Sequence, residues 1–105
     1  MAISMTKVKN LLKREHPGTI VPHLRNIRIN GNLRGCSGFL ENTRTGRFVY
    51  ICLEDRFYNP DNCAGMYRTA TGLDDYTGGR NRWGKDLQDL ISSAVALTFS
   101  ITPVE

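Results

Sequence analysis

The chain has 105 residues, a formal net charge of +4, and 40% hydrophobic and 23% charged side chains. This composition excludes a disordered chain, and the length predicts a single small domain, residues 1–105. No apolar run approaches the about 18 residues of a membrane-spanning helix, and the first residues lack the apolar stretch of a signal peptide. We therefore expect a cytoplasmic protein that does not enter a membrane.

The positive charge is concentrated in the first half of the chain. Residues 1–53 carry nine basic and two acidic side chains, whereas residues 54–105 carry five basic and eight acidic ones. Ten of the 14 cations are arginines, which suit bidentate contacts with phosphate or carboxylate groups. This pattern favours a basic surface that attracts a polyanion or an acidic partner. The alternative is a solvated surface that only keeps a small protein soluble.

Three cysteines, Cys36, Cys52 and Cys63, occur without a C-x-x-C pair. An odd number argues against a disulfide framework and predicts reduced thiols, with Cys36 and Cys52 as small buried hydrophobes in strands. A zinc site made from the three cysteines with His16 or His23 would lack the usual short spacing between ligands. We therefore expect neither a metal nor a cofactor.

The first predicted element is a helix over residues 6–15. Ser4 or Thr6 is a suitable N-cap, and Val8, Leu11 and Leu12 recur at helical spacing. The helix is expected to end at residues 16–18, His-Pro-Gly, because a residue before proline disfavours the helical conformation. A link over residues 19–24 contains a proline, which is typical of an edge or irregular segment.

Three strands are predicted next, as an antiparallel meander. Ile27 and Ile29 alternate with arginine before Asn30 and Gly31, the dipeptide most typical of a tight hairpin. The second strand covers residues 32–41, where two glycines allow a bend or bulge. After a turn over residues 42–46, residues 47–53 form the strongest strand, rich in β-branched and aromatic side chains, and are expected at the centre of the sheet.

The second half of the chain predicts one more short strand and a helix. Residues 54–64 form a polar loop, residues 66–70 a possible fourth strand, and residues 71–79 a loop rich in glycine and aspartate. The helix is expected to begin at residue 84 or 85 and to end at residue 99, with leucines and other apolar residues on one face. The predicted fold is α+β, a three- to four-stranded antiparallel sheet with an N-terminal and a C-terminal helix on one face.

The first candidate site is the segment that precedes the second helix. Gly78 and Gly79 would offer backbone amides to a phosphate at a helix N-terminus. Arg80 and Arg82 would add charge, while Tyr76 and Trp83 would stack on bases. The alternative is a tight turn in which Trp83 folds onto the core and the arginines pair with Asp74 and Asp75.

The second candidate site is a basic stripe on the meander. Five arginines lie on or beside the three strands, and helices on one face of a sheet leave the other face free to bind a nucleic-acid backbone. Aromatic stacking platforms would be needed there, but the pattern assigns Phe39, Phe48 and Tyr50 to the core. The five arginines of this site are Arg25, Arg28, Arg34, Arg44 and Arg47.

The signals for an enzyme are poor, and a small enzyme is a third interpretation behind two binding functions. Residues 35–38, Gly-Cys-Ser-Gly, do not match the nucleophile elbow G-x-S-x-G, and no histidine is placed to activate Cys36 or Ser37. Asp74 and Asp75 are adjacent carboxylates that point in different directions on most backbones, which makes them poor acid–base partners. We expect no catalytic residues.

Residues 66–70 (MYRTA), 75–83 (DYTGGRNRW) and 28–39 (RINGNLRGCSGF) resemble segments of small proteins encoded by phages and mobile elements of Firmicutes, and the resemblance covers about two-thirds of the chain. It transfers no activity and no catalytic residues. It implies a protein of the bacterial host cell that inhibits host defence, as anti-CRISPR proteins do, or an accessory nucleic-acid binder. The positive net charge argues against an acidic mimic of DNA.

Two functions therefore remain open. The first is an anti-CRISPR-like inhibitor that binds a host defence nuclease or nucleoprotein through an arginine-rich surface. The second is an accessory module that contacts DNA or RNA directly. Pairing of the exposed edge around residues 27–29 would also permit a homodimer.

Overall fold

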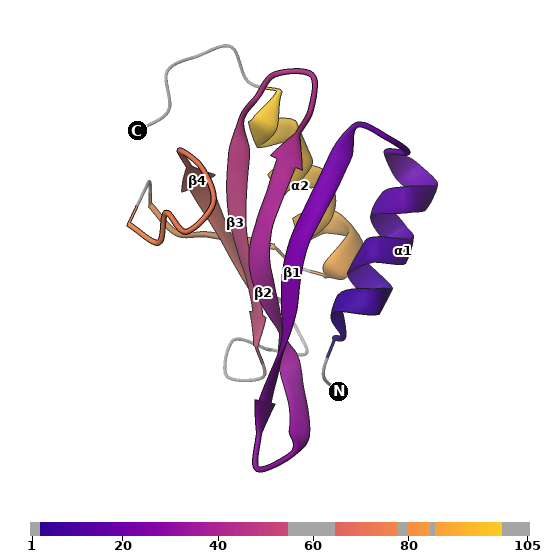
Figure 1. Cartoon of the computed structure of the whole chain (residues 1–105), viewed down its shortest axis with the longest axis vertical. Helices are drawn as coiled ribbons and strands as arrows, with labels where there is room; N and C mark the ends of the chain where they lie inside the picture. Colours follow the sequence, from indigo (N-terminus) through magenta and orange to yellow (C-terminus); the bar gives the residue numbers. More distant parts are fainter. Residues whose placement is uncertain (1–2, 55–64, 78–79, 85, 100–105) are drawn as a thin grey trace.

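The computed structural model describes residues 3–54, 65–77, 80–84 and 86–99. The strands form one antiparallel sheet in sequence order, and both helices lie on one face of it (Figure 1). The predicted α+β class is confirmed, with one strand more than expected. The elements are α1 (Met5–Glu15), β1 (Ile20–Ile29), β2 (Asn32–Asn42), β3 (Phe48–Glu54), β4 (Gly65–Ala70), β5 (Arg82–Gly84) and α2 (Leu87–Thr98).

Helix α1 follows its sequence signals closely. The hydroxyl oxygen of Ser4 accepts a hydrogen bond from the backbone N–H of Lys7, which makes Ser4 the N-cap, and the helix ends before His16. Val8, Leu11 and Leu12 are buried against the sheet. Neither α1 nor α2, the helices of the described part of the chain, is long and apolar enough to cross a membrane.

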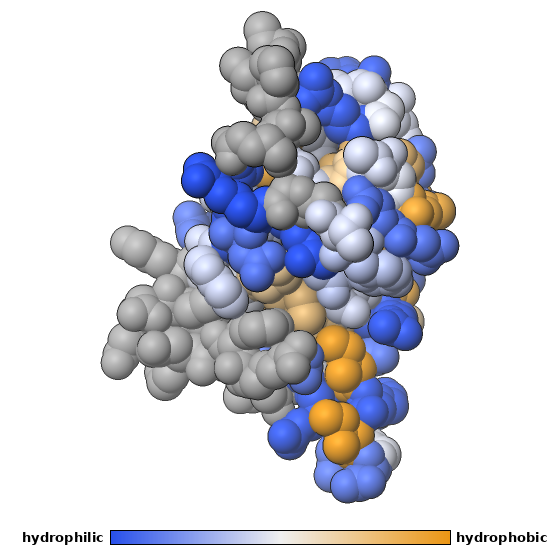
Figure 2. Space-filling model, turned by 90° about the vertical axis from the view of Figure 1, so that its left-hand side faces the viewer, coloured by the Kyte–Doolittle hydropathy of each residue, from blue (hydrophilic) through white to orange (hydrophobic). Residues whose placement is uncertain are grey.

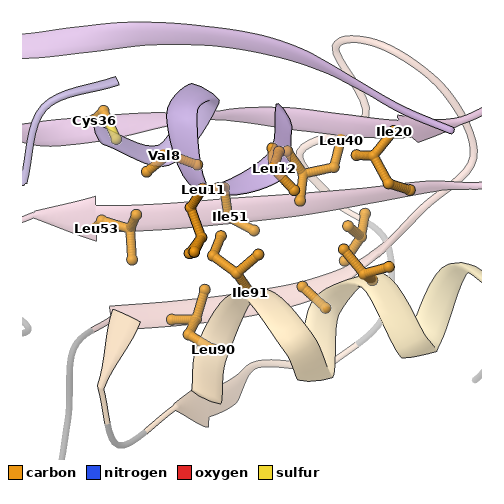
Figure 3. Close-up of a cluster of buried hydrophobic side chains, with 13 residues drawn as sticks. Val8, Leu11, Leu12, Ile20, Cys36, Leu40, Ile51, Leu53, Leu90 and Ile91 are labelled. Atoms are coloured by element: carbon orange, nitrogen blue, oxygen red, sulfur yellow. The ribbon is translucent and has the colours of Figure 1, made fainter. Parts of the chain in front are cut away.

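The core lies between the helices and one face of the sheet. Leu40 pairs with Val49 across β2 and β3, and both side chains are fully buried. Figure 3 shows Leu40, Ile51 and Leu53 on the sheet facing Leu12 of α1 and the α2 residues Leu90 and Ile91. Burying side chains of this size stabilises the fold by about 2 kcal/mol each. Alternation along the strands then assigns the neighbouring side chains to the other face of the sheet.

That other face, which no helix covers, holds aromatic side chains. Phe39 pairs with Tyr50, one position along from the core pair of Leu40 and Val49, and Phe48 pairs with Glu41. The prediction that these aromatics belong to the core is confirmed for Phe39, which is buried on the helix-free face, whereas Phe48 and Tyr50 on that face are only half-buried. Strand β3 is apolar on both faces, so the sequence does not show which face the helices cover. Phe39 is nevertheless only 3% exposed.

The predicted link over residues 19–24 is the first part of β1. This strand lies at the edge of the sheet. An edge strand tolerates a proline such as Pro22, which has no backbone N–H to donate. Strands β1 and β2 continue into a hairpin that projects beyond the helices (Figure 1). Asn30 and Gly31 both have positive φ at its tip, as the sequence predicts for a tight turn. The pairing shifts between Ile27 and Arg28, which leaves Arg34 as an extra residue on β2.

Helix α2 begins later than predicted, because the chain first adds strand β5 to the sheet. Gly84 pairs with Gly65, and a Cβ at Gly84 would meet Leu90 of α2, so the strand and the helix pack very closely. Asp86 then caps α2 by accepting a hydrogen bond from the backbone N–H of Asp89 at 2.7 Å. A start at residue 84 or 85 is therefore wrong by two to three residues.

A buried polar contact joins the β2–β3 turn to the end of α2. Asn42 is fully buried, and its side-chain amide donates to the Thr98 hydroxyl at 3.0 Å. The Asn42 side-chain oxygen accepts from the backbone N–H groups of Arg44 and Thr45 at 2.9 and 3.2 Å. Thr45 in turn donates to the Thr98 carbonyl. Asn42 therefore shapes the turn and anchors it to the helix layer.

Candidate nucleic-acid interface

The structure separates the five meander arginines. Arg28 and Arg34 lie at the projecting hairpin, and Arg44 and Arg47 lie at the β2–β3 turn, at the opposite end of the sheet (Figure 1). The 11 residues of β2 between these ends span about 33 Å at about 3.3 Å per residue. The prediction of one stripe that includes all five arginines is therefore wrong. In an antiparallel meander, two successive turns lie at opposite ends of the sheet.

A second set of cations joins the arginines of the hairpin. Helix α1 packs on β1 and β2, while α2 packs on β2 to β5, so one flank of α1 lies beside the β1 edge. Lys7 and Arg14 line the groove of about 370 Å³ between the helices. At about 100° per residue, Lys9 and Lys13 then lie on the opposite flank, towards β1.

Five cations, from the hairpin, from β1 and from the flank of α1 that faces β1, form a group that we call the basic edge. All are exposed, and the sequence has no aspartate or glutamate between Glu15 and Glu41. Figure 2 shows apolar side chains, in orange, among hydrophilic ones, in blue, at the projecting end of the hairpin; Ile29 there is 48% exposed. The basic edge comprises Lys9, Lys13, Arg25, Arg28 and Arg34.

The predicted basic stripe contained only arginines on or beside the strands and did not include these two lysines. The signal was available in the helix itself. Lys9 and Lys13 are four residues apart and share a face, away from the face that Lys7 and Arg14 share. The sequence does not show that α1 packs on β1. This packing places the helix face with Lys9 on the same side of the molecule as the arginines of the hairpin.

Three aromatic rings pack together on the helix-free face. Tyr76, from the loop between β4 and β5, contacts Phe39 and Tyr50 with ring centroids 5.4 and 5.7 Å apart. The guanidinium of Arg68 lies 4.8 Å from the centre of the Tyr50 ring and donates hydrogen bonds to the Tyr76 carbonyl and the Asn81 side chain. Tyr76 remains 49% exposed. The loop therefore covers Phe39 while presenting its own ring to solvent.

Asp75 holds this loop in shape. Its two carboxylate oxygens accept hydrogen bonds from the backbone N–H and hydroxyl groups of Thr71 and Thr77 at 2.9–3.1 Å. These bonds, above all that from the Thr71 backbone, lower the pKa of Asp75 from 3.8 to about 2. Asp75, which the sequence offered as a partner for the loop arginines, thus binds two threonines of its own loop.

Asp75→Asn is expected to destabilise the protein in a pH-dependent way. Because the folded pKa lies below the unfolded one, the ionised carboxylate contributes stability above about pH 4, and this contribution disappears as the pH falls through about 2. Urea denaturation of both proteins at pH 7, 4 and 2.5 measures it: the difference in unfolding free energy should narrow on acidification. Asp74→Asn, which removes a charge without touching the threonine contacts, is the control. A difference that stays constant with pH would contradict this role.

The phosphate site predicted before α2 is not supported by the described residues around it. Gly78 and Gly79 lie outside the described residues. The N-terminus of α2 is capped by the Asp86 carboxylate, and Asp89 adds a second acidic group to the first turn. These negative charges already complement the helix dipole and repel a phosphate there.

The other predicted residues of this segment lie apart from one another. Arg80 is exposed before β5, and Arg82 pairs with Tyr67, which packs against the core on the helix side of the sheet. Trp83 pairs with Met66 on the helix-free face and is 52% exposed. The alternative in which Trp83 folds onto the core is therefore wrong, because β5 turns its side chain to the other face.

The described cysteines are buried free thiols, as predicted. Cys36 faces the helices, whereas Cys52, paired with Ser37, lies on the opposite face. Burial raises the pKa of Cys36 to about 12, so its thiol is protonated at neutral pH and is a poor nucleophile. Cys63 lies outside the described residues. Within the described ranges, no three histidine, cysteine or acidic side chains are grouped to hold a metal.

The features with the clearest capacity for binding are thus the basic edge and the aromatic helix-free face beside it. Comparison with known proteins adds no assignment: the chain matches no family model, no curated protein and no solved structure.

Proposed function

We propose that the protein is a small, non-enzymatic module that binds nucleic acid, with the basic edge contacting the phosphate backbone. The observation that carries the proposal is the grouping of five exposed cations, from α1 and the β1–β2 hairpin, in a part of the chain with a single acidic residue before Glu41. Cations of this kind bind nucleic acid by neutralising phosphates and releasing condensed counterions. Arginine adds bidentate contacts with phosphate oxygens.

The shape of the hairpin supports this use. Its tip extends past the helix layer, so Arg28 and Arg34 can reach a strand of nucleic acid that α1 and α2 would otherwise hold away. Arg25 lies further along β1, with Lys9 and Lys13 on the helix beside it. The cations thus follow the length of one edge, which suits an extended polyanion better than a small anion.

Neutralising the hairpin arginines should weaken binding and make it less sensitive to salt. For Arg28→Gln/Arg34→Gln we expect the association constant to fall about tenfold or more near 100 mM salt, and the slope of log K against log salt to fall by about 2. Fluorescence polarisation with a labelled single strand and a duplex, from about 50 to 200 mM salt, measures both quantities.

The matched control is Arg44→Gln/Arg47→Gln, which removes the same charge at the opposite end of the sheet. It should change the affinity much less, because these arginines lie outside the basic edge. Equal effects of the two pairs would show that only net charge matters. Absence of binding at about 50 mM salt, where backbone contacts are strongest, would overturn the proposal.

An inhibitor of host defence remains the second candidate. The observation in its favour is Ile29, an apolar side chain that is 48% exposed at the projecting hairpin, where a protein partner can bury it. This function predicts that the protein protects a targeted plasmid in a host with an active defence nuclease. It also predicts little affinity for free oligonucleotides, which separates it from the first candidate.

A further inference from the structure

We infer that the helix-free face holds one unpaired nucleobase, in the pocket between β1, β2 and the loop of residues 71–77, and that this makes the protein select single strands over duplexes. The inference rests on the proposed function, since the basic edge supplies the contacts to the backbone. It adds a place for the base and hence a preference among nucleic acids.

The pocket has the size and chemistry for a flat aromatic ligand. Its volume is about 230 Å³, and its lining includes Phe39, Tyr76 and Leu73 as apolar surface and Arg25, Ser37 and Asp74 as polar groups. Half of the Tyr76 side chain is exposed, so the ring can stack on a base. The Asp74 carboxylate can accept hydrogen bonds from the amino or imino groups of a base.

The stacking ring is held in place before any ligand arrives. Phe39 and Tyr50 meet the Tyr76 ring at 63° and 77°, and Arg68 binds the Tyr76 carbonyl. Asp75 closes the loop through Thr71 and Thr77, and Asp74 beside it adopts φ of 66°, a conformation uncommon outside glycine. A rigid platform loses little conformational entropy when it binds, which favours affinity.

One arginine, Arg25, connects the pocket to the basic edge. Arg25 belongs to both, since it lines the pocket and lies on β1, the edge strand on which α1 packs. A backbone that follows the basic edge therefore passes the pocket, and an adjoining base can turn into it. A base in a duplex is already paired and stacked, and it would first have to leave the helix, which costs unpairing and unstacking free energy.

Tyr76→Ala tests the pocket without removing a phosphate contact. We expect its affinity for a single strand to fall about tenfold, its affinity for a duplex of equal length to stay unchanged, and its salt slope to match that of the unmodified protein. Tyr76→Phe, which keeps the ring, should retain single-strand binding. Circular dichroism and a thermal melt establish that both variants are folded.

A second measurement uses the unmodified protein and so does not depend on a variant. Nucleoside 5′-monophosphates are titrated while backbone amide shifts are followed by NMR, and shifts should concentrate at residues 23–25, 37–39 and 73–76. The pocket inference is overturned if these shifts are absent, or if single strand and duplex bind alike and Tyr76→Ala changes neither. In that case the proposed function would still be supported if binding depends on salt and is weaker in Arg28→Gln/Arg34→Gln. If the unmodified protein binds neither single strand nor duplex, the proposed function itself is overturned.

Discussion

Gly35→Ala is expected to cost more than about 4 kcal/mol of unfolding free energy, enough to leave the protein largely unfolded. Gly35 adopts φ of +146°, where only glycine is free of strain, and a Cβ at this position would overlap the carbonyl oxygen of Leu53 on the neighbouring strand. The carbonyl oxygen belongs to the backbone of β3, and the Cβ is fixed rigidly to the backbone of β2, so a side-chain rotation cannot relieve the clash. Urea denaturation followed by circular dichroism measures the loss.

Gly46→Ala is the matched control for this prediction. Gly46 also has positive φ, +73°, but nothing lies within 4 Å of a Cβ built there. Gly46→Ala should therefore lower the unfolding free energy by only about 1 kcal/mol, the cost of placing a non-glycine residue in the left-handed backbone conformation. If Gly35→Ala is no more harmful than Gly46→Ala, β2 and β3 do not approach as closely at this point as the structure shows.

Asn42→Ala should destabilise the protein by about 3 kcal/mol, because it removes three hydrogen bonds of a fully buried side chain, each worth about 1 kcal/mol. The substitution removes the donor to Thr98 and the acceptor for two backbone N–H groups of the β2–β3 turn. Chemical denaturation at neutral pH gives the change in unfolding free energy. A loss below about 1 kcal/mol would contradict the anchoring role.

A double-mutant cycle separates the two halves of this contact. Thr98→Val removes the hydroxyl that binds Asn42 and donates to the Val95 carbonyl, with little change in volume. Because the bond between the two side chains is lost in either single variant, the double variant should cost less than the sum of the two. Additive costs would show that Asn42 acts through the turn alone and does not stabilise the α2 contact.

The sequence predicts most of the fold because its signals are local. The N-cap at Ser4, the helical spacing of Val8, Leu11 and Leu12, and the Asn30–Gly31 turn each determine structure within a few residues. Strand β5 has only three residues, too few to show alternation, and it exists because β4 offers an edge to pair with. A contact between segments distant in sequence thus decided the one strand that was missed.

The candidate site was harder to predict for the same reason. The sequence predicts Arg28 on a strand and Arg44 in a turn of the same meander. Only the topology shows that they lie at opposite ends of the sheet. Tyr76 was a candidate for stacking, but its packing on Phe39 depends on a loop that Arg68 and Asp75 shape. Residue type indicated the chemistry, whereas its grouping required the three-dimensional arrangement.

The strand order β1-β2-β3-β4-β5 also has a consequence for the order in which the chain folds. Each strand pairs with the strand next to it in sequence, so the first hairpins close short loops at a small entropic cost and can form early. The contact between Asn42 and Thr98 spans 56 positions and must wait for α2. During synthesis, Leu40, Val49 and Ile51 are made well before Leu90 and Ile91, which complete their core. A nascent chain therefore passes through a stage in which the part of the sheet's apolar face that α2 covers is still exposed, and it is most prone to aggregate until the last helix docks.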